Sequence, residues 1–166
     1  MRFWLLDSIE SFTPDEELVA VKNVSYSEEY LQDHFPEFPV LPGVFMLEAA
    51  TQAAAWLMRL TDDLADTVIV LREAKNIKYA NFVQPGQKLR VTVRQLKKDE
   101  RFATFKVEGL VDEAATLSGR IVLERYSLAD TDPLQESTDQ KVRGYLSKVA
   151  RAIAKPEMLP ANVRVV

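Results

Sequence analysis

The sequence predicts an α+β fold in which one long apolar helix packs against an antiparallel sheet. Residues 44–60 read VFMLEAATQAAAWLMRL and are apolar on nearly every helical face, a pattern typical of a helix enclosed by other structure. Later in the chain, the segments KLRVTVRQL and FATFKVEGL alternate apolar and polar residues with the period of half-buried antiparallel strands. One helix combined with a run of adjacent strands belongs to the α+β class.

The other strands are predicted on both sides of this helix. Alternating residues around a turn at Pro14-Asp15 predict two early strands, and a short helix and four later strands follow. The predicted strands cover 2–9, 17–25, 67–82, 87–98, 101–112 and 115–127, and the short helix covers 26–32. Such a sheet has two edges, and we expect edge pairing with a second copy of the chain to cover one of them.

Residues 128–166 are predicted to extend a main domain of residues 1–127. Residues 127–138 read as a linker, and Ser137 with Gln140 resembles a capping box for a helix that ends near Lys155. The helix has an apolar face of Val142, Tyr145, Leu146, Val149 and Ile153, and a basic face of Lys141, Arg143, Lys148, Arg151 and Lys155. A basic amphipathic helix can lie on a membrane. However, Gly144 weakens the isolated helix by about 1 kcal/mol, which favours packing on the chain's own sheet or on a neighbouring subunit.

Composition narrows the classes of protein and site. A chain of 166 residues, 47% of them hydrophobic, suits one domain with a substantial core. The absence of cysteine excludes disulfides and thiol catalysis, and a single histidine argues against a zinc site. The early apolar run FWLL is interrupted by Asp7, so neither a signal peptide nor a membrane span is expected, and we expect a cytoplasmic location.

Charge is unevenly distributed along the chain. The formal net charge is −4, yet residues 72–106 contain ten basic and three acidic residues, so this segment carries +7 and the remainder −11. A run of charge usually marks the solvated face of strands. A docking surface for an acidic partner fits equally well, whereas the acidic overall balance and the lack of a recognition motif disfavour nucleic acid.

The only histidine, His34, lies in a segment that points to proton transfer. Three prolines keep residues 34–42 extended, and Gly43 then opens the apolar helix, whose one carboxylate is Glu48. An imidazole can accept a proton near neutral pH, and a carboxylic acid in apolar surroundings holds a proton that it can donate. His34 and Glu48 are therefore predicted to act as base and acid, although either residue alone would also suit a structural role.

Two further residues of the helix are predicted to support this pair. Gln52 lies one turn after Glu48 and is a suitable hydrogen-bond partner for its carboxyl group. The backbone N–H groups at the helix start, near Gly43, have no partner within the helix and could bind a developing oxyanion.

The segment HFPEFPVLPGVFMLEAATQ resembles the motif of the FabA/FabZ-type 3-hydroxyacyl-acyl-carrier-protein dehydratases, in which a histidine precedes a helix carboxylate by fourteen residues. FWLLDSIES, VAVKNVSYSEEYLQDHFP and NIKYANFVQPGQKL are also similar to that family, so the resemblance spans about residues 3–126. Glutamate at the acid position points to the dehydration-only, FabZ-type branch. The resemblance implies a hotdog fold, with the sheet wrapped around the helix.

Three positions depart from the family pattern. Asp33 replaces the glycine that usually precedes the histidine, Gln87 replaces the aspartate of a PGD turn, and Phe82 replaces a proline. The catalytic pair is retained. Acyl-chain selectivity and rate are the properties that these departures would alter.

The resemblance implies reversible removal of water from a 3-hydroxyacyl thioester on acyl carrier protein, giving the trans-2-enoyl thioester. It implies that His34 removes the C2 proton and that Glu48 donates a proton to the departing hydroxyl. It also implies that the Gly43 amide polarises the thioester carbonyl and that the Val40 carbonyl orients the imidazole. No cofactor is implied. Tunnel candidates are Phe45, Tyr79 and Phe82, and candidates for carrier docking are Lys75, Lys78 and Lys97. The family's histidine and carboxylate come from opposite protomers, which implies a homodimer with shared active sites and allows a trimer of dimers, a homohexamer.

Two alternative functions stay open on the sequence. A hotdog thioesterase can use a carboxylate on the central helix, but hydrolysis does not require this histidine in this loop. A catalytically silent subunit that binds the acyl carrier is the other alternative, and the presence of both His34 and Glu48 counts against it.

Overall fold

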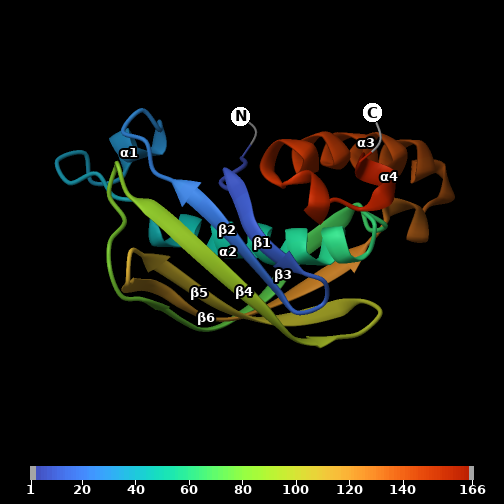
Figure 1. Cartoon of the computed structure of the whole chain (residues 1–166), viewed down its shortest axis with the longest axis horizontal. Helices are drawn as coiled ribbons and strands as arrows, with labels where there is room; N and C mark the ends of the chain where they lie inside the picture. The colour runs from blue at the N-terminus through green and yellow to red at the C-terminus, as the bar shows by residue number, and fades with distance from the viewer. Residues whose placement is uncertain (1–2, 165–166) are drawn as a thin grey trace.

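The computed structural model describes residues 3–164 and confirms the α+β prediction. A six-stranded antiparallel sheet, in the order β1-β2-β4-β5-β6-β3, curves around the long helix α2 (Figure 1), which is the hotdog arrangement. The strands are β1 (Ser8–Thr13), β2 (Glu17–Asn23), β3 (Val68–Tyr79), β4 (Lys88–Lys98), β5 (Phe102–Val111) and β6 (Ala114–Tyr126). Within residues 3–164, no helix has the length and apolar character needed to cross a membrane.

Helix α2 (Gly43–Thr61) is enclosed because its sequence leaves no polar face to expose. Twelve of its nineteen residues are buried, and its alanines let the sheet approach closely while Trp56 fills the space at the centre. The helix starts after Pro42, which is suited to the position before a helix, and ends at Asp62. The predicted boundaries of this helix are therefore correct to within a residue.

The two edges of the sheet differ. β1 has six residues and an irregular register. The end of the C-terminal helix α3 (Glu136–Ile153) lies against the first residues of β1, and these residues line a cavity together with residues 152–155. β3 has twelve residues, is paired on one side only, and is exposed along most of its length. An edge strand of this kind is a template for pairing with another chain.

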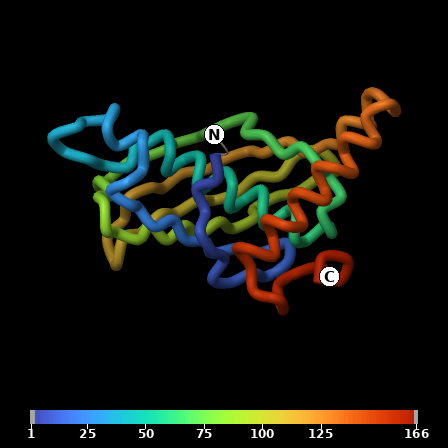
Figure 2. Tube along the Cα trace, turned by 90° about the horizontal axis from the view of Figure 1, so that it is seen from above, coloured from blue at the N-terminus to red at the C-terminus, as the bar shows by residue number. Residues whose placement is uncertain are grey.

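The C-terminal extension packs on its own chain, as the sequence favoured. After β6, two short 3₁₀ helices, η1 (Leu128–Asp130) and η2 (Pro133–Gln135), lead into α3, and η3 (Pro156–Met158) and α4 (Ala161–Arg164) follow. Leu146 and Ala150 are buried, and the indole N–H of Trp4 donates to the Tyr145 hydroxyl at 2.6 Å. Viewed from above (Figure 2), α3 crosses the end of the molecule where α2 finishes, beside the N-terminal segment.

Several predicted details are wrong. The first strand begins at Ser8 rather than residue 2, and the helix before the catalytic loop is only α1 (Tyr30–Asp33). Ser137 does not cap α3, because the helix already begins at Glu136. The capping box occurs ten residues earlier, where Ser127 and Asp130 close η1, so the predicted linker is structured.

Asp139 ties the extension to the sheet. Its carboxylate is fully buried and accepts hydrogen bonds from the Thr67 hydroxyl just before β3, from the Ala129 N–H at 2.9 Å and from the Leu128 N–H at 3.2 Å. Burial alone would raise the pKa of Asp139, but these three donors outweigh it and hold the pKa below its ordinary value of 3.8.

We expect Asp139→Asn to lower the thermal unfolding midpoint at neutral pH, because an amide cannot accept all three hydrogen bonds. A carboxyl group whose pKa is lowered by folding stabilises the fold at pH values above its ordinary pKa of 3.8. This stabilisation is lost as the pH falls through the pKa of the folded state. The midpoints of variant and wild type should therefore converge below about pH 3.8 when followed by circular dichroism. Asp112→Asn, in an exposed turn, is the control; a gap that is equal at every pH would contradict the role of the ionised carboxylate.

Candidate active site

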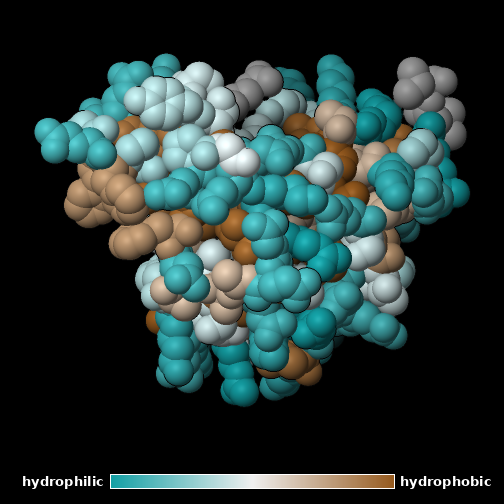
Figure 3. Space-filling model, turned by 60° about the vertical axis from the view of Figure 1, so that its left-hand side comes forward, coloured by the Kyte–Doolittle hydropathy of each residue, from teal (hydrophilic) through white to brown (hydrophobic). Residues whose placement is uncertain are grey.

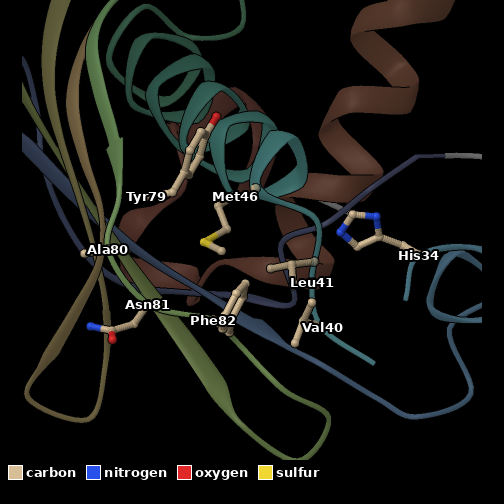
Figure 4. A pocket seen from close by; sticks show the side chains of 9 residues that line it. His34, Val40, Leu41, Met46, Tyr79, Ala80, Asn81 and Phe82 are labelled. Atoms are coloured by element: carbon tan, nitrogen blue, oxygen red, sulfur yellow. The ribbon is translucent and has the colours of Figure 1, made fainter. Parts of the chain in front are cut away.

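His34 lies at the mouth of a cavity of about 270 Å³ beside the start of α2. The cavity is lined from the loop by His34, Val40 and Leu41, from the helix by Gly43 and Met46, and from the other side by residues 79–82 (Figure 4). The predicted histidine, helix start and Val40 therefore share one cavity. Among residues 3–164, however, no hydrogen bond joins the His34 ring to the Val40 carbonyl, so that contact stays a prediction.

The loop that carries His34 is held by backbone hydrogen bonds as well as by its prolines. The His34 N–H closes α1 on the Tyr30 carbonyl, and Phe35 takes a positive φ of 50° that reverses the chain. The Phe38 N–H then bonds the Phe35 carbonyl at 2.8 Å, and the Leu41 N–H bonds the Val83 carbonyl at 2.8 Å. These contacts fix both ends of the loop relative to α2, and the His34 ring packs against the Phe35 ring at a tilt of 56° with centroids 4.3 Å apart.

Gly43 allows a close approach of the Tyr79 ring. A Cβ atom at residue 43 would lie 3.3 Å from the Tyr79 ring, tighter than ordinary contact. The ring therefore covers the start of α2, where the first N–H groups have no acceptor inside the helix. Burial raises the pKa of the Tyr79 hydroxyl, so this side chain is neutral near pH 7.

Glu48 lines a different cavity, of about 390 Å³, on another part of α2. It is half-buried and accepts a hydrogen bond from the Gln52 side-chain N–H at 2.8 Å, which confirms the predicted pairing. The same buried Gln52 amide donates to the Phe3 carbonyl and accepts from the Leu5 N–H, both at 3.0 Å. Gln52 thus fixes the position of Glu48 relative to the N-terminal segment.

A single chain therefore does not bring His34 and Glu48 into one cavity. Tyr79, at the end of β3, lines the first cavity, and Ile69, near the start of β3, lines the second. Both cavities reach the same open edge of the sheet, but at opposite ends of the strand.

The tunnel candidates separate into two groups. Tyr79 and Phe82 line the His34 cavity, whereas Phe45 does not. Phe45 is partly buried and packs edge-on against Phe3 and Tyr30 with centroids 4.8 Å from each, and its role in a tunnel stays a prediction. Exposed apolar side chains gather at this end of the molecule (Figure 3), namely Phe35, Phe38, Val44, Tyr79 and Phe82.

One of the docking lysines, Lys75, belongs to a row of basic residues that the sequence analysis did not find. Lys75, Lys78 and Lys97 are all exposed, and Lys75 forms an ion pair with Glu73. Strand register places Lys75 beside Arg120, Arg120 beside Lys106, and Lys106 beside Arg94. The row was missed because it depends on pairing between strands distant in sequence.

The cavity of Glu48 is also lined by five polar or aromatic residues that were not predicted for the site: Phe3, Trp4, Thr51, Arg59 and Tyr145. Arg59 could have been found, because it follows Glu48 by eleven residues, a spacing that returns to the same helix face. Within residues 3–164, no group of three or more His, Asp or Glu side chains has an arrangement suited to a metal ion.

The structure shows the surroundings of two residues that depart from the family motif, Gln87 and Asp33. The Gln87 side chain accepts the Gln84 N–H at 2.7 Å and so closes the turn at Gly86, whose φ of +86° favours glycine. Asp33 is exposed at the end of α1. Neither residue blocks the His34 cavity.

Comparison with known proteins identifies the family. The family model described as ApeI-like, ApeI dehydratase, matches residues 10–120. A 3-hydroxyacyl-[acyl-carrier-protein] dehydratase FabZ from Shewanella loihica is 35% identical over 130 residues, covering 76% of this chain and 85% of the relative, and FabZ from Lactiplantibacillus plantarum is 33% identical over 110 residues, covering 66% and 75%.

Solved structures agree on the fold. A dehydratase heterocomplex ApeI:P from Xenorhabdus doucetiae contains a chain that matches with a TM-score of 0.65 at 20% identity, covering 80% of this chain and 90% of that one. A mutant thioesterase from Pseudomonas aeruginosa matches with a TM-score of 0.57 at 17% identity, covering 72% and 81%. The hotdog fold therefore hosts both chemistries, and the sequence matches decide between them: the chain belongs to the ApeI-like dehydratase family and is related to the FabZ dehydratases.

Proposed function

We propose that the protein removes water reversibly from 3-hydroxyacyl chains carried on acyl carrier protein, giving trans-2-enoyl chains for fatty acid or related acyl-chain synthesis. The observation that carries this proposal is the cavity in which His34 faces the start of α2 at Gly43. A base beside backbone N–H donors suits a reaction that removes a proton next to a thioester carbonyl.

The reaction requires two proton movements in one site. The His34 imidazole takes the C2 proton, and the electron pair of that C–H bond is delocalised onto the thioester oxygen, which the Gly43 N–H stabilises. As the C2–C3 double bond forms, the C3–O bond breaks, and Glu48 donates a proton so that the hydroxyl leaves as water. The Val40 carbonyl would hold the other imidazole nitrogen and fix its tautomer.

We infer that two chains build each active site. Antiparallel pairing of β3 with β3 of a second copy inverts the strand, so the Tyr79 end of one chain lies beside the Ile69 end of its partner. His34 of one chain then approaches Glu48 of the other, and the second chain covers the exposed apolar side chains beside the His34 cavity. A trimer of such dimers and a cytoplasmic location stay predictions.

Thioester hydrolysis is the competing activity. Glu48 could direct a water molecule, but hydrolysis gives no role to a base placed for the C2 proton. Product analysis separates the two: an enoyl thioester supports dehydration, and a free acid with a free thiol supports hydrolysis. If neither product forms from substrates of any acyl-chain length, a catalytically silent subunit that binds the acyl carrier would be favoured.

The acyl carrier is proposed to dock on the basic outer face of the sheet. Lys78 adjoins Tyr79 of the His34 cavity, so an acidic partner bound there lies near the cavity entrance. The row of Lys75, Arg120, Lys106 and Arg94 crosses four strands, and its charge is partly offset by ion pairs with Glu73, Glu17 and Glu108.

Replacing Glu48 with Gln should lower the dehydration rate at least about 100-fold while preserving the fold, because the amide oxygen can still accept from Gln52. Steady-state conversion of a 3-hydroxyacyl thioester, with circular dichroism as a folding check, measures this. Glu113→Gln, in an exposed turn, is the matched control. Near-normal turnover by a folded Glu48→Gln protein would remove Glu48 from the mechanism.

Co-expressed His34→Ala and Glu48→Gln chains should regain activity that neither has alone. A two-fold dimer of unlike chains contains one doubly altered site and one intact site, so purified heterodimers should show about half of wild-type activity. Differently tagged chains allow the heterodimer to be isolated and assayed. Heterodimers as inactive as the parents would mean that the pair acts within one chain.

Changing Lys75, Lys78 and Lys97 together to Glu should lower kcat/KM for a carrier-bound substrate by about tenfold or more, with a defect that grows at low salt. A small pantetheine thioester should be converted as before. The matched control reverses three exposed lysines of the C-terminal region: Lys141, Lys148 and Lys155. An equal loss with both substrates would count against docking at this surface.

A further inference from the structure

The cavity of Glu48 continues along one face of α2 to a partly buried cation, Arg59. Thr51, Gln52, Ala55 and Arg59 follow Glu48 at helical spacing and all line it, with Trp4 and Tyr145 on the opposite wall. Arg59 is the basic residue among the described residues that line this space. It lies far from the reacting groups and has no part in the proton transfers.

Arg59 lacks a countercharge in contact with it. Its Nε atom is buried without a hydrogen-bond partner, and within residues 3–164 no ion pair involves its guanidinium. Burial lowers the pKa of Arg59 to about 10, although Asp66 opposes this from a distance, so the group is charged near neutral pH. Its guanidinium carbon lies 5.5 Å from the centre of the Trp56 ring, which does not supply an acceptor for the N–H donors.

The neighbouring polar groups are already engaged. The Gln52 amide makes three hydrogen bonds, the Thr51 hydroxyl donates to the Leu47 carbonyl at 3.0 Å, and the Trp4 N–H donates to Tyr145. A charged group whose burial is not offset by a partner is costly to the fold. The hydrogen-bond donors of this cavity that lack an acceptor therefore belong to Arg59. An anion that enters the cavity could accept hydrogen bonds from them.

The spacing sets the size of the molecule that can reach both ends. Eleven residues of helix separate Glu48 from Arg59, about 16 Å along the axis at about 1.5 Å per residue. Helical side chains lean toward the N-terminus, and because both lean the same way, the two functional groups stay on the order of 15 Å apart along the axis. An extended carbon chain advances about 1.25 Å per bond for bonds of about 1.5 Å, so roughly twelve bonds span this gap.

We propose that Arg59 is a specificity residue that selects acyl chains long enough to reach it and ending in a carboxylate. This inference rests on the proposed dehydratase function and refines its substrate class. The planar guanidinium fork matches a carboxylate in a bidentate pair, whereas a methyl end would bury its chain against an unpaired cation.

The test compares two 3-hydroxyacyl pantetheine thioesters of equal length, one ending in a carboxylate and one in a methyl group, at several lengths around the reach of Arg59. Wild-type protein should have the higher kcat/KM for the carboxylate end. Arg59→Met should lower the carboxylate-to-methyl ratio by about 10- to 100-fold, the range for a hydrogen bond to a charged group. Arg59→Lys should restore part of the ratio, and Lys148→Met, on the exposed face of α3, should leave it unchanged.

Binding measured by calorimetry keeps this inference separate from the catalytic one. One outcome is that the wild type binds the carboxylate-ended thioester selectively, that Arg59→Met abolishes this binding, and that no thioester is turned over. This outcome would support the selectivity role of Arg59 and reject the dehydratase proposal. Turnover of both thioesters without preference would reject Arg59 selectivity alone. An equal loss on both ends in a folded Arg59→Met protein, or a shift in its dimer dissociation, would also overturn the inference, since Arg59 would then act in the fold or the subunit interface.

Discussion

The need to bury α2 determines the rest of the structure. A nineteen-residue helix with twelve buried residues is unstable in water alone, so the sheet must curve around it. Small alanine side chains bring the strands close, and the large side chain of Trp56 fills the remaining space. The part of the helix that the sheet leaves accessible is the part that lines the two cavities, so enclosure of the helix also defines where chemistry can occur.

The polar residues of α2 then divide the work of position and reaction. Gln52 satisfies two backbone groups of the N-terminal segment and one oxygen of Glu48, so the same amide joins the fold to the site. Gly43 admits the Tyr79 ring at the helix start. Asp139 fastens the C-terminal extension at the start of β3, and that extension supplies the Tyr145 wall of the Glu48 cavity. An addition at the end of the chain therefore contributes to the shape of the site.

Sequence patterns predicted what depends on local periodicity and failed where tertiary contacts decide. The limits of α2 and of the later strands followed from apolar spacing, and Gln52 followed from its position one turn after Glu48. The start of β1 was misplaced because residues 3 and 5 are held by Gln52 rather than by a strand. The capping box was misplaced because Ser127 and Ser137 both fit the motif, and Ser137 lies inside α3, which begins at Glu136. The packing of Phe45 with Phe3 and Tyr30 and the basic row across the strands both depend on tertiary contacts, which the sequence pattern does not show.

The chain's two tryptophans, Trp4 and Trp56, lie together with ring centres 6.0 Å apart. Trp4 lines the cavity of Glu48, and Trp56 lies beneath the Arg59 guanidinium. Indole emission shifts with the polarity and water content of its surroundings, and here no third indole elsewhere in the sequence dilutes the signal. The protein thus contains an intrinsic fluorescent reporter at one wall of its candidate site, which can register ligand entry or release of the C-terminal helix without any added label.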